Sequence, residues 1–279
     1  MSFTPVLPLT GYTGWTFLKR TMEVQKEAYT STPVMQRDEE YFRQNIAKIQ
    51  SAEDLVSDRR LLKVALGAFG LDDDINNKYF IQKVLSDGTT SKDALSSKLA
   101  DKAYAKLSAA FGFGEGETPA TQTEGFADTI LTAYEARQFE IAVGDQDDTM
   151  RLALNAEREL SELAAKTSSD DTKWFTVMGS EPLREVFETA LGLPDGFVSL
   201  DLDQQLQTLR EKTKALTGDG EISQFSDPDQ VEALVRRYLI RAEIESGAIS
   251  SMTPGAGALM ILQSGSSNAS YSILSALYS

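Results

Sequence analysis

The spacing of apolar side chains along this chain predicts helices over most of its length. Residues 227–247 contain six apolar or aromatic positions that recur with a period close to 3.6: Val231, Leu234, Val235, Tyr238, Leu239 and Ala242. Residues 147–166 contain a similar stripe: Leu152, Ala156, Leu160 and Leu163. No segment has the alternation of apolar and polar residues that is typical of a strand. The sequence therefore predicts an all-α protein, a multi-helix bundle.

Several helix ends can be predicted from single residues. Asp227 is the expected N-cap of the last strong helix, with Pro228 in its first turn. Ser51 is an expected N-cap earlier in the chain. Gly70 is the expected C-terminal cap of the helix predicted from Leu61 to Ala68. These residues divide the apolar stripes into separate helices.

Residues 91–125 predict one longer helix followed by a linker. Residues 91–112 carry an apolar spacing that continues across the segment: Leu95, Leu99, Ala103 and Leu107. Residues 112–125 are rich in glycine and have no apolar period, so we expect a linker there.

Two stretches of the chain resemble each other, which predicts an internal repeat. LLKVALGAFGLDD, from Leu61, matches LREVFETALGLPD, from Leu183, and each predicted helix closes with Gly-Leu. A weaker match, in the same order, joins FADTILTAYEARQFEIAVG to FSDPDQVEALVRRYLIRAEIESG. We therefore expect one integrated domain over residues 1–279, built from two diverged helical repeats at approximately 38–145 and 170–246.

Both ends of the chain are uncharged and partly apolar. No charged side chain precedes Lys19, and none occurs in the tail, residues 247–279. Large apolar residues seldom remain exposed together unless they contact something. The ends either pack on the protein's own helices or join another chain, and a flexible tail without a role is a third reading. The candidate interaction residues are Trp15, Phe17, Leu259, Ile261, Leu262, Ile273, Leu274 and Leu277.

Composition excludes several kinds of active site. The 279 residues include no cysteine and no histidine. Disulfides, thiolate nucleophiles, Cys/His zinc sites and Ser-His-Asp catalysis are therefore excluded. We expect no enzymatic activity, no cofactor and no metal.

The charge of the chain limits its partners and its location. A net charge of −15 disfavours nucleic acid, because phosphate binding needs a basic surface. No segment is long and apolar enough to span a membrane, and the N-terminus lacks the pattern of an ordinary signal peptide. We expect a protein partner, and a chain that stays in the cytoplasm or is exported without a cleaved signal peptide.

Two charged clusters are candidate binding sites. Arg236 and Arg237, on the last predicted helix, could receive an acidic partner, although a solvated helix face would look the same. Asp72, Asp73 and Asp74 could bind a hard cation through oxygen ligands. The alternative is that these acids begin the next helix, where negative charge is favourable.

Four blocks of the sequence together resemble a known family. AFGLDD, YEARQFEIAVGDQDDTMRLAL, EVFETALGLPDGFVSLDLDQQLQTL and FSDPDQVEALVRRYL resemble the blocks of an uncharacterised bacterial family that is widespread in alphaproteobacteria and often encoded near flagellar genes. The match runs from about Tyr41 to about Ile244. The resemblance implies a mostly helical fold and a link to motility, and it supplies no catalytic residues to carry over.

These observations favour a non-catalytic structural or protein-interaction protein associated with the flagellum. Flagellar rod, hook and filament proteins typically have low-charge termini, which is an analogy with the ends of this chain. The partner would be a flagellar component or a second copy joined through the termini. The alternative is a helical binding module that holds a small ligand or cation in an acidic pocket, and a carboxylate-dependent hydrolase is a third reading.

Overall fold

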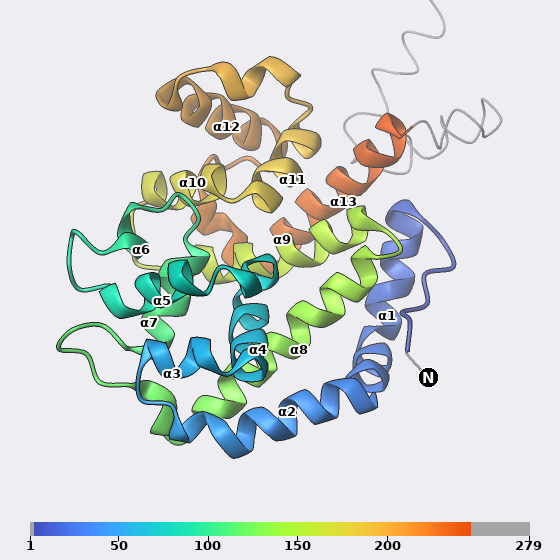
Figure 1. Cartoon of the computed structure of the whole chain (residues 1–279). Coiled ribbons are helices and arrows are strands. Elements are labelled where there is room, and N and C mark those ends of the chain that lie inside the picture. Colours follow the sequence, from blue (N-terminus) through green and yellow to red (C-terminus); the bar gives the residue numbers. More distant parts are fainter. Residues whose placement is uncertain (1–2, 247–279) are drawn as a thin grey trace, which may run out of the picture.

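The computed structural model describes residues 3–246 and confirms the all-α prediction, since no strand occurs within that range (Figure 1). The helices are α1 (Gly11–Thr30), α2 (Pro33–Asn45), α3 (Ala52–Ser57), α4 (Arg59–Phe69), α5 (Lys78–Asp87), α6 (Leu95–Lys98), α7 (Ala103–Phe111), α8 (Phe126–Gly144), α9 (Asp148–Ala164), α10 (Asp170–Gly179), α11 (Glu181–Leu191), α12 (Leu202–Thr217) and α13 (Pro228–Glu245). Five short 3-10 helices connect them: η1 (Ile46–Lys48), η2 (Asp72–Asn76), η3 (Ala120–Gln122), η4 (Asp195–Ser199) and η5 (Ile222–Ser226).

The apolar side chains form two cores rather than one. The first core lies among α2–α5, α7 and the first part of α8, and its buried aromatic members are Phe42, Phe111, Phe126 and Tyr134. The second core lies among α1, the end of α8, α9–α13, η4 and η5, and its buried aromatic members are Trp15, Phe139, Trp174, Phe187, Phe197, Phe225 and Tyr238. α8 runs from the first core into the second, and Figure 1 shows it crossing the molecule between α4 and α1.

Two of the predicted caps are made by side-chain hydrogen bonds. Ser51 Oγ accepts from the backbone N–H of Asp54 at 3.1 Å and begins α3. Asp227 accepts from the backbone N–H of Asp229 at 2.9 Å and begins α13, with Pro228 as its first residue. Both predictions are confirmed, because short polar side chains at these positions satisfy amides that the helix leaves free.

The helices α4 and α11 end in the same way. Gly70 has φ +74°, and the next residue, Leu71, donates its N–H to the carbonyl of Leu66 at 3.0 Å. Gly192 has φ +64°, and Leu193 donates to the carbonyl of Glu188 at 2.9 Å. A residue in this left-handed conformation is most easily glycine, so both helices stop where the sequence predicts.

An arginine from a later helix covers each of these two glycines. A Cβ on Gly70 would lie 3.0 Å from Arg137 Nη1 of α8, and a Cβ on Gly192 would clash with Arg241 Nη2 of α13. Three residues before each arginine is a buried tyrosine, which belongs to the core of its own half: Tyr134 and Tyr238.

The single long helix predicted over residues 91–112 is wrong. The structure breaks it into α6 and α7, because the Asp101 carboxylate accepts from the backbone N–H of Ala103 at 2.8 Å and starts a new helix there. The Lys102 ammonium donates to the carbonyl of Leu99 at 2.8 Å, just past the end of α6. The apolar spacing continues through the break, so periodicity alone does not reveal it.

The start of the chain lies on the protein's own helices. The backbone N–H of Val6 donates to Gln25 Oε1 at 2.6 Å, and Gln25 Nε2 donates back to the carbonyl of Val6 at 3.2 Å. Gln146 Nε2 donates to the carbonyl of Pro5, which ties this stretch to the turn between α8 and α9. For residues 3–10 the structure therefore has the first of the three arrangements considered for the chain ends: they pack on the protein's own helices.

Within residues 3–246, every helix is too short or too polar to cross a lipid bilayer. The uncharged tail, residues 247–279, lies outside the described residues.

Candidate functional site

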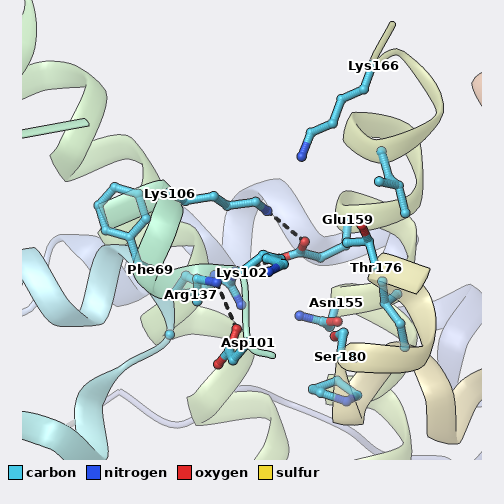
Figure 2. A pocket seen from close by; sticks show the side chains of 16 residues that line it. Phe69, Asp101, Lys102, Lys106, Arg137, Asn155, Glu159, Lys166, Thr176 and Ser180 are labelled. Atoms are coloured by element: carbon cyan, nitrogen blue, oxygen red, sulfur yellow. Dashed lines mark hydrogen bonds and ion pairs between the residues drawn. The ribbon is translucent and has the colours of Figure 1, made fainter. Parts of the chain in front are cut away.

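A network of ion pairs lies at the boundary between the two cores, and we call it the seam. It consists of five side chains from α7, α8 and α9: Lys106, Arg137, Glu140, Arg158 and Glu159. Glu159 Oε1 accepts from Arg137 Nη2 at 2.6 Å and from Arg158 Nη1 at 2.9 Å, and its Oε2 accepts from Lys106 Nζ at 2.9 Å. Figure 2 shows the lysine and the carboxylate meeting across the space between the helices.

A second carboxylate, that of Glu140, binds the Arg158 guanidinium through the Nε and Nη2 atoms that Glu159 does not contact. Arg158 donates from Nε to Glu140 Oε1 at 2.8 Å and from Nη2 to Glu140 Oε2 at 3.0 Å, a two-point contact. With its amide oxygen turned towards the arginines, Asn155 accepts from Arg137 Nη1 at 3.3 Å and from Arg158 Nη2 at 3.0 Å. Both arginines of the seam, Arg137 and Arg158, therefore donate to the Asn155 amide as well as to carboxylates.

The seam fixes the charge state of its groups. Burial raises the pKa of Glu159, but Lys106, Arg137 and Arg158 outweigh burial and lower this pKa to about 2. Burial lowers the pKa of Arg158, and the contacts with Glu140 and Glu159 more than reverse this. A general acid or base works best with a pKa near the operating pH, so these shifts favour a structural role.

The cavity beside the seam is small. Its volume is about 110 Å³, and its lining includes Lys102, Lys106, Arg137, Glu159 and Lys166. Figure 2 shows Lys166 directed from the end of α9 towards the space between Lys106 and Glu159. Because each water molecule takes about 30 Å³ of liquid, the cavity has room for a few waters or a small ion.

A larger cavity adjoins it, and we call it the acidic crevice. Its volume is about 790 Å³, and it lies between η2, α7, α9 and α11. Six of its lining residues are acidic: Asp73, Asp74, Asp101, Asp148, Glu181 and Glu185. Burial, and then the charge of Asp148, raises the pKa of Glu185. This crevice is the feature of the structure that corresponds best to an acidic pocket.

The three consecutive aspartates after Gly70 do not act together. Asp72 accepts from Gln138 Nε2 of α8 at 2.8 Å, and burial raises its pKa. Asp74 accepts from the Tyr104 hydroxyl of α7 at 2.5 Å, and Asp73 lines the acidic crevice. In the part of the chain that the structure describes, no three acidic side chains are placed to hold a metal ion.

Two of the predicted interaction residues meet between α1 and α13. Trp15 is 1% exposed, and its indole N–H donates to Glu232 Oε2 at 3.3 Å. The other carboxylate oxygen of Glu232 accepts from the Tyr12 hydroxyl at 3.0 Å, and the Arg236 guanidinium lies 5.0 Å from the centre of the Tyr12 ring. Trp15 and Arg236 therefore join α1 to α13.

The other candidates are more dispersed. Phe17 is half-buried on α1, and the exposed Arg237 donates from Nε to the carbonyl of Ala190 at 2.7 Å. Burial, and then the nearby Arg241, lowers the pKa of Arg237. The candidates Leu259, Ile261, Leu262, Ile273, Leu274 and Leu277 lie outside the described residues.

Sequence reasoning did not identify the seam. Its members come from three helices, and each looks like an ordinary charged helix position in its own segment. The one local signal is the pair Arg158 and Glu159, which lies between the stripe residues Ala156 and Leu160. Charges that flank an apolar stripe so closely are expected at the edge of a core, where a partner must neutralise them.

Comparison with known proteins gives two matches. The profile of a family described as "Protein of unknown function (DUF1217)" matches residues 68–231. The crystal structure of protein AGR_C_984 from Agrobacterium tumefaciens is similar to this chain, with a TM-score of 0.70 and 27% sequence identity. The similarity covers 87% of this chain and 99% of that chain. The comparison with functionally curated proteins gave no match.

The family match includes the seam and part of each core, and it lies within the range over which the sequence resembles an uncharacterised bacterial family. The chain therefore belongs to the DUF1217 family of proteins of unknown function.

Proposed function

We propose that this chain is a non-catalytic structural or protein-interaction protein associated with the bacterial flagellum. The non-catalytic part of this proposal is supported by the seam. Its charged groups are paired with one another, and the pKa of Glu159 is moved away from neutrality, to about 2. A carboxyl that serves as a general acid would instead have a raised pKa, closer to the operating pH.

We also infer that the two cores belong to two diverged helical repeats. In each half, a helix ends at Gly-Leu, a 3-10 turn and a further helix follow, and a last helix presents a buried tyrosine and an arginine over the glycine. The glycines are Gly70 and Gly192, and the arginines are Arg137 and Arg241. Duplication of one unit would account for the two separate cores and for the charged boundary between them.

The flagellar association is supported by the resemblance of four sequence blocks to a family often encoded near flagellar genes. It is also supported by analogy, since the chain is acidic, lacks cysteine and has uncharged ends. The partner in this proposal is a flagellar component or a second copy of the chain. The protein would act in the cytoplasm or after export without a cleaved signal peptide.

The proposal is tested by gene deletion in a motile alphaproteobacterium that encodes this chain. Loss of swimming is expected, together with recovery when the full chain is restored. Variants that neutralise two of the six crevice carboxylates, Asp148→Asn and Glu185→Gln, should restore swimming equally well. Undiminished swimming after deletion would contradict the flagellar part. Folded variants that fail to restore swimming would show that the crevice takes part in the function, which would contradict a purely structural role.

The acidic crevice favours one alternative function, the binding of a small cationic ligand. Its volume of about 790 Å³ lies in the range of small-molecule sites, and it is lined by six carboxylates. Titration of the full chain with a polyamine such as spermidine tests this function. Saturable stabilisation against heat in the wild type, lost in Asp148→Asn/Glu185→Gln, would support the alternative. An equal response in both proteins would count against it.

A further inference from the structure

Three large, exposed apolar side chains lie within five residues of one another in the second half of the chain, and we call them the apolar ledge. They are Val198, Leu200 and Leu202, which are 51%, 40% and 60% exposed. They occupy alternate positions in the short connection from η4 into α12. Single exposed apolar residues are common, but three within five residues are characteristic of a contact surface.

The ledge is held in a fixed conformation. Gln205 is buried, and its Nε2 donates to the carbonyl of Leu200 at 2.7 Å and to the carbonyl of Val198 at 3.3 Å. Asp201, between the ledge residues, accepts from the backbone N–H of Gln204 at 2.8 Å and caps α12. A surface that is already ordered loses little conformational entropy when a partner binds.

The same turn in the first half is built from polar residues. The N-caps Asn77 and Asp201 occupy corresponding places before α5 and α12. Counted from these caps, the counterparts of Val198, Leu200 and Leu202 are Asp74, Asn76 and Lys78. The turn therefore does not require apolar side chains, and their exposure on the second half needs a separate explanation.

We propose that the chain's own C-terminal segment, residues 247–279, covers the ledge through Leu259, Ile261 and Leu262. Electrostatics disfavours an acidic occupant. The exposed Asp201 lies within the ledge, the exposed Asp203 follows it, and the chain carries a net charge of −15, so an acidic segment would be repelled. Residues 247–279 carry no charged side chain.

The segment is also long enough to reach the ledge. Leu259 follows Ser246 by only a short stretch of chain, which spans up to about 43 Å when extended. α12 and the end of α13 both lie towards the top of the view in Figure 1. A tether of this length gives the apolar block an effective concentration on the order of millimolar at the ledge. Docking within one molecule is therefore favoured over capture of a second copy.

Engineered cysteines test this docking in the full chain, which has no natural cysteine. The test variant is Leu202→Cys/Ile261→Cys. The matched control is Lys78→Cys/Ile261→Cys, because Lys78 is also exposed and, counted from the N-cap, occupies the corresponding position of the first half. Under mild oxidation we expect an intramolecular disulfide to form about tenfold faster in the test variant, which corresponds to about 1.4 kcal/mol of docking. Equal rates, or disulfide-linked dimers as the main product, would overturn the proposal.

Amide hydrogen exchange gives a second measurement without a crosslink. In the full wild-type chain, peptides covering residues 256–264 should exchange more slowly than in Val198→Ser/Leu200→Ser/Leu202→Ser, with no change across α4 and α9. Identical exchange of these peptides in both proteins would overturn the proposal. Both tests use the purified chain alone, so their outcome does not depend on a flagellar partner.

Discussion

Replacing Glu159 with glutamine tests whether the seam stabilises the fold. The substitution keeps the shape of the side chain but removes the negative charge that Lys106, Arg137 and Arg158 share. It also places an amide nitrogen, a donor, among three other donors. The side chain is only 16% exposed, so water replaces the lost partner poorly.

The size of the effect follows from the pKa of Glu159. The pKa falls from an ordinary value of 4.5 to about 2 in the folded chain. Each unit corresponds to about 1.4 kcal/mol, so the interactions of the charged carboxylate contribute about 3 kcal/mol near neutral pH. This agrees with the lower end of the range of about 3–5 kcal/mol for breaking a buried ion pair. The lower end is expected because Lys106 is about one third exposed.

The pH dependence has a definite sign. A carboxyl whose pKa is lowered by folding stabilises the protein fully above its unfolded value of 4.5, and this contribution is lost as the pH falls towards 2. Urea unfolding followed by circular dichroism should give a wild-type advantage of about 3 kcal/mol at pH 7, narrowing towards zero near pH 2.

A matched control lies on the same helix. Glu162 is 54% exposed and 3.6 Å from Lys106, so Glu162→Gln should change the unfolding free energy by no more than about 0.5 kcal/mol. A loss of less than about 1 kcal/mol in Glu159→Gln at pH 7 would refute the reasoning, because an exposed ion pair gives the same value. So would a difference between wild type and Glu159→Gln that stays constant from pH 7 to pH 2.

Two further substitutions test the C-terminal glycine cap of α11 and the hydrogen bond at the end of α9. Gly192→Ala should lower the unfolding free energy by about 2 kcal/mol, because φ is +64° and the new Cβ would meet Arg241. Gly218→Ala, where φ is +93° and the space around the Cβ is open, should lose only about 1 kcal/mol in the same urea assay. Lys173→Met should lower stability by about 1–3 kcal/mol, because the buried ammonium donates to the Ala164 carbonyl at 3.0 Å. Thermal denaturation would detect this loss, and an unchanged midpoint would show that water replaces the ammonium at this carbonyl.

Local sequence signals were sufficient for most of the fold. Helical spacing, the caps at Ser51 and Asp227, and the stop at Gly70 each depend on residues within one or two turns of each other. The break before α7 was missed because it depends on the Asp101 side chain turning back to Ala103 while the apolar spacing continues.

The seam could not be predicted in the same way. Lys106, Arg137 and Glu159 are each separated along the chain by more than twenty residues, and the contact among them exists only after α7, α8 and α9 have packed. Trp15 illustrates the same limit. Its apolar character suggested a contact, and the contact is with Glu232 of α13 in the same chain.

The ionic character of the seam has a consequence for the geometry of the whole molecule. Apolar packing is non-directional, so two apolar helix faces can shift against each other, whereas a hydrogen-bonded ion pair has a preferred length and direction. Glu159 receives donors from α7, α8 and its own helix α9, so the length of its side chain limits how these three helices can be spaced. Shortening it by one methylene, as in Glu159→Asp, would require α7 and α8 to move towards α9 or would lengthen these hydrogen bonds.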